Sequence, residues 1–192
     1  GYLGRELALM DSIKKFYPEA KTIFCSLDSV EGRLDLLGEV ESVDYFRVKS
    51  ENPDLASRGK SFSEQLFTYM PLLTKTAVSK VKPGELLIYL DSDIELLSRL
   101  DDLVNEMDGY SVGLFPHNYS FLNKLLSNRY GIFNAGAVLV RNDPVGHEFL
   151  AKWSSLAFEW CYDKPEDGKY AHQAYLNTLQ NEAGVKIIKS TN

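Results

Sequence analysis

Hydrophobic and polar positions follow helical and strand-like periods in turn along the chain. Apolar residues recur at helical spacing over residues 3–16, 31–37, 63–81, 119–126, 143–160 and 170–179, and a short helix is expected from Asp101. Apolar runs typical of strands lie at residues 22–27, 43–47, 86–90, 111–115, 130–140 and 185–188. This pattern predicts a single α/β domain over residues 1–192, Rossmann-like, with a mostly parallel central sheet and helices on both faces.

The most strongly apolar of these strands, 86–90, ends abruptly in Asp91-Ser92-Asp93. A continuous apolar run is typical of a central strand covered on both faces, and such sheets bind ligands beyond the carboxyl ends of their strands. Residues two apart on an extended backbone point to the same side, so Asp91 and Asp93 can face one hard cation, Mn²⁺ or Mg²⁺. The same residues could instead form a turn that caps the following helix.

Two other predicted strands also end in a polar residue. Asp28 follows strand 22–27, where it either contributes to a binding site or caps the next helix. His117 follows strand 111–115, where it either packs against its neighbours or contacts a substrate.

Strand 130–140 carries small residues where larger side chains would normally fill space. Gly136 lies between Ala135 and Ala137 and permits close approach of a ligand to the backbone. Asn134 can both donate to and accept from hydroxyl groups. The alternative explanation for this segment is a β-bulge.

Composition excludes several classes of protein. The chain has 27 acidic and 21 basic side chains, a net charge of -6, and its basic residues are scattered, which argues against nucleic-acid binding. Cys25 and Cys161 lack the paired spacing of zinc or redox motifs. Because no apolar segment approaches the roughly 20 residues of a membrane span and no signal pattern opens the chain, we expect a soluble cytoplasmic protein.

The segments "LLIYLDSDI", "GIFNAGAVLVRN" and "HQAYLN", with the aromatic helix 143–160 between the last two, occur in an order that resembles the nucleotide-sugar glycosyltransferases of the GT-A fold. The resemblance is to family 8 and to related bacterial nucleotide-diphospho-sugar transferases, and it covers nearly the whole chain. It implies a GT-A domain and a metal-dependent transfer of a sugar, from UDP-sugar or another nucleotide-diphosphate donor, to an acceptor hydroxyl. The resemblance also implies a carbohydrate or glycan acceptor and retention of the anomeric configuration.

The resemblance also implies roles for particular residues. Asp91 and Asp93 match the metal-binding carboxylates, and Asp91, Ser92 and Asp28 lie where the nucleotide part of the donor is expected. The donor sugar is expected at Asn134, Ala135 and Gly136. The family usually has Asp-Gln where this chain has His172-Gln173, and these two residues together with Asn134 are the candidate catalytic residues.

The differences from the family leave alternatives open. A neutral imidazole at His172 cannot replace a carboxylate in stabilising charge, so a degenerate nucleotide- or sugar-binding protein is one alternative. The family's first strand and its C-terminal histidine ligand have no counterpart in residues 1–192, so the domain is expected to lack both. A phosphatase of the haloacid-dehalogenase type is less favoured, because its Asp-x-Asp motif prefers the start of a chain and Thr or Val after it, whereas Ile94 follows here.

Overall fold

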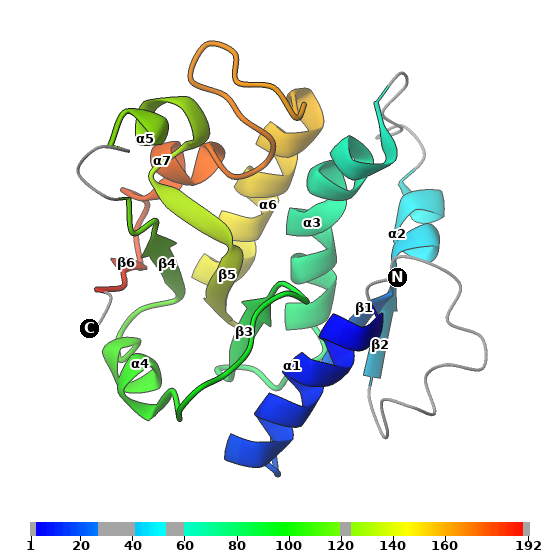
Figure 1. The fold of residues 1–192 in the computed structure, drawn as a ribbon, viewed down its shortest axis with the longest axis vertical. Helices are drawn as coiled ribbons and strands as arrows, with labels where there is room; N and C mark the ends of the chain where they lie inside the picture. The colour runs from blue at the N-terminus through cyan, green and yellow to red at the C-terminus, as the bar shows by residue number, and fades with distance from the viewer. Residues whose placement is uncertain (1–2, 27–40, 53–59, 120–123, 190–192) are drawn as a thin grey trace.

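The computed structural model describes residues 3–26, 41–52, 60–119 and 124–189 (Figure 1). The helices are α1 (Leu3–Phe16), α2 (Tyr45–Glu51), α3 (Phe62–Val78), α4 (Asp101–Glu106), α5 (Lys124–Tyr130), α6 (Pro144–Glu159) and α7 (Tyr175–Leu179). The strands are β1 (Ile23–Ser26), β2 (Glu41–Asp44), β3 (Leu86–Leu90), β4 (Val112–Pro116), β5 (Phe133–Arg141) and β6 (Val185–Ile187).

The described strands form two sheets. Strands β1 and β2 pair in parallel, and the larger sheet has the order β3-β5-β4-β6. Strand β5 runs antiparallel to both β3 and β4, whereas β4 and β6 are parallel. The α/β class is confirmed, but the larger sheet is mixed and not mostly parallel. The apolar pattern of a buried strand does not encode its direction, which explains the difference from the expectation.

Helices cover both faces of the larger sheet. On one face, α6 packs Leu150 and Trp153 against Val138 and Val140 of β5, and α3 joins this core through Val78. On the opposite face, a smaller cluster contains Leu139 of β5 and apolar residues in and next to α4 and β6 (Leu103, Met107 and Ile188). The alternation of side chains along β5 thus supplies both cores.

Helix α3 lies beside α6 and also forms a second core with the β1–β2 pair (Figure 1). Ser61 starts α3 with a capping box, because its hydroxyl accepts the Glu64 N–H while Glu64 accepts the Ser61 N–H. Asp143 caps α6 in a similar way by accepting the Gly146 N–H, and Pro144 fits the first helical position.

Several predicted boundaries were wrong. The strand predicted over residues 43–47 ends at Asp44, whose Oδ1 accepts the N–H groups of Phe46 and Arg47 and so starts α2. The helix predicted at 119–126 continues to Tyr130, and its start falls on residues 120–123, which lie outside the described residues. The helix predicted at 170–179 is helical only from Tyr175. The helix predicted at 31–37 lies outside the described residues. Within the described ranges, no helix combines the length and apolar character needed to cross a membrane.

Candidate functional site

Asp91 lies directly against Gly136, at the point where β3 leaves the sheet. Leu90 pairs with Ala137, and the Asp91 N–H donates to the Gly136 carbonyl at 2.8 Å. A Cβ atom on Gly136 would lie 2.8 Å from Asp91 Oδ2 and 3.0 Å from Asn134 Oδ1. The carboxylate of Asp91 and the amide of Asn134 therefore flank the same glycine, and a larger residue would displace them.

Strand β5 is irregular at this point. Leu114 of β4 pairs with Val138, but the next residue, Phe115, pairs with Asn134, so the register shifts between these two pairs. This irregularity agrees with the bulge considered as an alternative from the sequence. Gly136 lies against Asp91 because the pairing of β3 with β5 continues beyond Leu90 and Ala137. Asn134 Oδ1 accepts the Gly136 N–H at 2.8 Å, and the Asn134 side chain is exposed.

Gln173 connects the candidate site to the segment before α7. Its Oε1 accepts the Ala135 N–H at 3.2 Å, and its Nε2 donates to the Tyr130 carbonyl at 2.9 Å. Both ends of this amide hold the backbone at the start of β5. The structure thus places Gln173 against the backbone of Ala135, between Asn134 and Gly136.

Tyr89 is a site residue that the sequence analysis missed. Its hydroxyl donates to Asp91 Oδ1 and lies 3.8 Å from Met70 Sδ on α3. The pKa of Tyr89 is raised well above its usual value by burial and by the nearby Asp91 charge, so the hydroxyl stays protonated. The spacing could have revealed this residue, because Tyr89 and Asp91 are two apart and point to the same side.

The surroundings of the Asp91 carboxyl raise its pKa. Its carboxyl lies against Tyr89 and Gly136, and this loss of hydration raises its pKa. The hydrogen bond from Tyr89 opposes that rise, and the negative charge of Asp93 adds to it. A cation beside both carboxylates would relieve their repulsion and favour the ionised form.

The two aspartates supply oxygen ligands alone. Among the described residues, no group of three or more His, Cys, Asp or Glu side chains could hold a metal ion. Two carboxylates fit Mg²⁺ or Mn²⁺, which keeps water ligands and binds substrate phosphates in its remaining positions. The backbone between them is not extended as expected, because Ser92 and Asp93 lie in a turn in which the Ile94 N–H donates to the Asp91 carbonyl at 3.1 Å. Asp28 lies outside the described residues.

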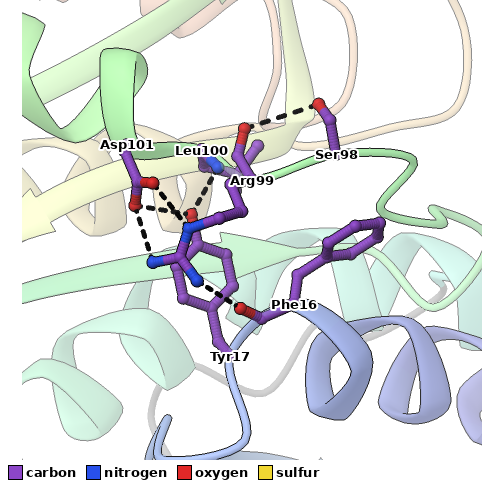
Figure 2. A network of polar contacts seen from close by, with 6 residues as sticks. All are labelled: Phe16, Tyr17, Ser98, Arg99, Leu100 and Asp101. Carbon is purple, nitrogen blue, oxygen red and sulfur yellow. Dashed lines mark hydrogen bonds and ion pairs between the residues drawn. The ribbon is translucent and has the colours of Figure 1, made fainter.

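The segment after Asp93 is held by the end of α1 (Figure 2). The Arg99 guanidinium donates to the Phe16 carbonyl at 2.6 Å, pairs with Asp101 at 2.6 Å and lies 4.4 Å from the centre of the Tyr17 ring. The Tyr17 hydroxyl in turn accepts the Leu100 N–H. Contacts far apart in sequence thus fix the chain that leaves the Asp-Ser-Asp turn.

His172 lies in the aromatic core and not beside Asp91. Its ring packs between those of Phe67 and Trp153, with centroids 5.5 Å and 5.6 Å away, and only 8% of the residue is exposed. Its carbonyl accepts the Trp153 Nε1–H at 2.8 Å, while its Nδ1 has no partner in the described structure. Burial lowers the pKa of His172 to about 4, so the imidazole is neutral.

His117 lies beside the site, at the end of β4. Its N–H donates to the Ile132 carbonyl at 2.8 Å, and its ring packs on Tyr119 with the centroids 4.8 Å apart. Burial lowers its pKa, and a hydrogen bond with Gln173 opposes that change. Its Nε2 is buried and lacks a partner among the described residues.

Comparisons with known proteins leave the family open. No family model matches the chain. The uncharacterized protein YfnF of Bacillus subtilis (strain 168) is 20% identical over 188 residues, which cover 93% of this chain. The chain spans 62% of the length of that relative. This similarity assigns no activity, so function must be argued from the site.

Proposed function

We propose that the chain is a metal-dependent glycosyltransferase that moves a sugar from a nucleotide-diphosphate donor, a UDP-sugar, to an acceptor hydroxyl with retention of configuration. The observation that carries the proposal is the position of the Asp91 carboxylate and the Asn134 amide on either side of Gly136. Gln173, from a third segment, is hydrogen-bonded to the same part of β5. These are the three segments on which the resemblance to GT-A transferases rests.

Each side chain has a task that follows from its contacts. The absence of a side chain on Gly136 lets the Asp91 carboxylate and the Asn134 amide lie against the β5 backbone, and Asn134 Nδ2 can donate to a sugar hydroxyl. Tyr89 fixes the orientation of the Asp91 carboxylate, and Gln173 fixes the backbone from which Asn134 projects. A divalent cation on Asp91 and Asp93 would neutralise charge on the departing diphosphate.

A second candidate is a binding protein of the same fold that does not catalyse transfer. The observation that favours it is His172, which occupies the position of the family's carboxylate but lies stacked in the core with its pKa lowered. A buried neutral imidazole supplies no negative charge near a reacting carbon. Hydrolysis of a nucleotide-sugar by the protein would exclude this candidate, and hydrolysis of a simple phosphomonoester would instead support the phosphatase.

Calorimetric titration of UDP tests the proposal directly. We expect UDP to bind in the presence of Mn²⁺, and binding to be lost with EDTA or in Asp93→Ala, because the cation links the carboxylates to the phosphates. Asp108→Ala is the matched control, since Asp108 is an exposed acidic residue just before β4. It precedes the start of this strand, whereas His117, beside the candidate site, follows its end. Absence of UDP binding under every condition would contradict the assignment to UDP-sugars.

A further inference from the structure

A cluster of aromatic side chains adjoins the candidate site on the side of β4 and α5. The ring of His117 packs on Tyr119, and the ring of Tyr130 meets that of Tyr170 edge to face with centroids 4.9 Å apart. All four side chains are half-buried, so each keeps exposed surface. Gln173 joins this cluster to the site, because its Nε2 donates to the Tyr130 carbonyl while its Oε1 accepts the Ala135 N–H.

Hydrogen bonds hold two of these rings in place. The Tyr119 hydroxyl donates to the Gly131 carbonyl at 3.2 Å, and the Tyr170 hydroxyl donates to Asp163 Oδ1 at 2.9 Å. Burial, and next the bond to Asp163, raise the pKa of Tyr170 to about 12, so this phenol is neutral. The rings therefore form a surface that is ordered before any ligand arrives, which reduces the entropy lost on binding.

His117 adds one polar group with a free position. Its Nε2 is buried without a partner in the described structure, although buried polar atoms normally have one. A neutral imidazole can accept a hydrogen bond from a hydroxyl group at this nitrogen. Aromatic rings beside a polar atom that lacks a partner match a sugar ring, which has apolar C–H faces and a hydroxyl rim.

We propose that Tyr119, Tyr130, Tyr170 and His117 bind a pyranose ring of the carbohydrate acceptor, with His117 Nε2 accepting a hydrogen bond from one of its hydroxyl groups. This inference rests on the proposed glycosyltransferase function, because it is the donor site at Asn134 and Gly136 that makes an adjoining sugar site an acceptor site. The link through Gln173 places the acceptor beside the position expected for the donor sugar.

Nuclear magnetic resonance titration with lactose, maltose and cellobiose tests the proposal. The side chains of His117, Asn134 and the three tyrosines and the backbone amide of Gly136 are observed, with and without UDP and Mg²⁺, because paramagnetic Mn²⁺ would broaden nearby resonances. At about 10 mM sugar, above the millimolar Kd expected for so small a contact, at least one disaccharide should shift these resonances. Tyr170→Ala and Tyr119→Ala should each weaken that binding about tenfold. Tyr110→Ala is the control, since Tyr110 is exposed just before β4, at the opposite end of that strand from His117.

The outcomes separate this inference from the proposed function. Normal binding of UDP shows that a tyrosine variant is folded. The sugar titration without UDP tests the acceptor site independently of UDP binding. No shift at the cluster with any disaccharide would overturn the acceptor site while leaving UDP binding intact. An affinity in both tyrosine variants equal to that of the unmodified protein would do the same. Shifts at Asn134 and Gly136 alone would place the sugar in the donor site and would also overturn it.

Discussion

His172 shows that the position of a residue in a sequence motif does not determine where its side chain lies in the structure. The sequence places it next to Gln173, and the resemblance implies a catalytic position for it. The structure instead stacks its ring between Phe67 and Trp153 and leaves Gln173 to reach β5. Sequence spacing predicts which residues are neighbours along the chain, but the direction of each side chain depends on packing from α3 and α6, which the motif does not contain.

The burial of His172 predicts a pH dependence of stability. The pKa of the folded imidazole is about 4, below its ordinary value of 6.5, so the unfolded chain takes up this proton first as the pH falls. The free energy of unfolding should therefore decrease between about pH 6.5 and pH 4, by up to about 3 kcal/mol, and this contribution should be constant above pH 6.5. His172→Phe keeps an aromatic ring in the stack and should remove this decrease. Urea denaturation at a series of pH values measures it.

His147 provides the control for that measurement. Its Nε2 is 2.8 Å from Asn142 Oδ1, outside the aromatic stack, so His147→Gln should keep the pH dependence of the unmodified protein. An equally steep decrease in His172→Phe would show that other groups cause it.

At the scale of elements, local periodicity predicted most helices and strands but not how they pair. The apolar run 86–90 and the helices starting near Ser61 and Asp143 were predicted correctly, because each carries its own signal in consecutive residues. The antiparallel direction of β5 and its shifted register depend on partners distant in sequence. Asp44 illustrates the limit of predicting elements from periodicity. The apolar pattern continues to residue 47, but the Asp44 side chain ends the strand and caps α2.

The candidate site could be predicted in part for the same reason. Asp91, Asn134 and Gln173 each lie at a recognisable boundary in the sequence, and the structure brings all three to Gly136 and Ala135. Tyr89 was not predicted, although its spacing from Asp91 could have indicated it. The Nε2 of His117, which lacks a partner among the described residues, could not be predicted, because the absence of a contact appears only in three dimensions.

The contact between β3 and β5 predicts the effect of a methyl group on Gly136. In Gly136→Ala the new Cβ would lie 2.8 Å from Asp91 Oδ2, closer than such contacts allow, so the carboxylate must move. We expect overpacking to cost about 1–3 kcal/mol of stability. Moving a cation ligand should also weaken Mn²⁺-dependent UDP binding about 10- to 100-fold, by analogy with disturbed metal-site neighbours. Calorimetry and urea denaturation measure the two effects.

Gly4→Ala is the matched substitution for this test. A Cβ on Gly4 would meet nothing within 4 Å, so this variant should bind UDP as the unmodified protein does. Unchanged UDP affinity in Gly136→Ala would mean that Asp91 does not bind the cation in the orientation seen here.

At the scale of the whole molecule, the long-range contacts of α1 hold the segment that leaves the candidate site. One set is the exposed network of Arg99 with Phe16, Tyr17 and Asp101 (Figure 2). The other is a single buried bond, in which Ser12 Oγ accepts the Leu96 N–H at 3.0 Å. Exposed ion pairs are screened by water and salt and contribute little, whereas a buried N–H that loses its partner is costly.

This contrast predicts that the buried hydrogen bond between Ser12 and Leu96 contributes more to stability than the exposed network of Arg99. Ser12→Ala should lower the free energy of unfolding by about 1–3 kcal/mol, because the Leu96 N–H would stay buried without an acceptor. Arg99→Ala should change stability little, and its small effect should shrink further at high salt. Urea denaturation of both variants at low and high salt measures which substitution lowers the free energy of unfolding more. A larger loss in Arg99→Ala would mean that the network in Figure 2 holds α1 in place, and that the turn at Asp93 depends on surface charge.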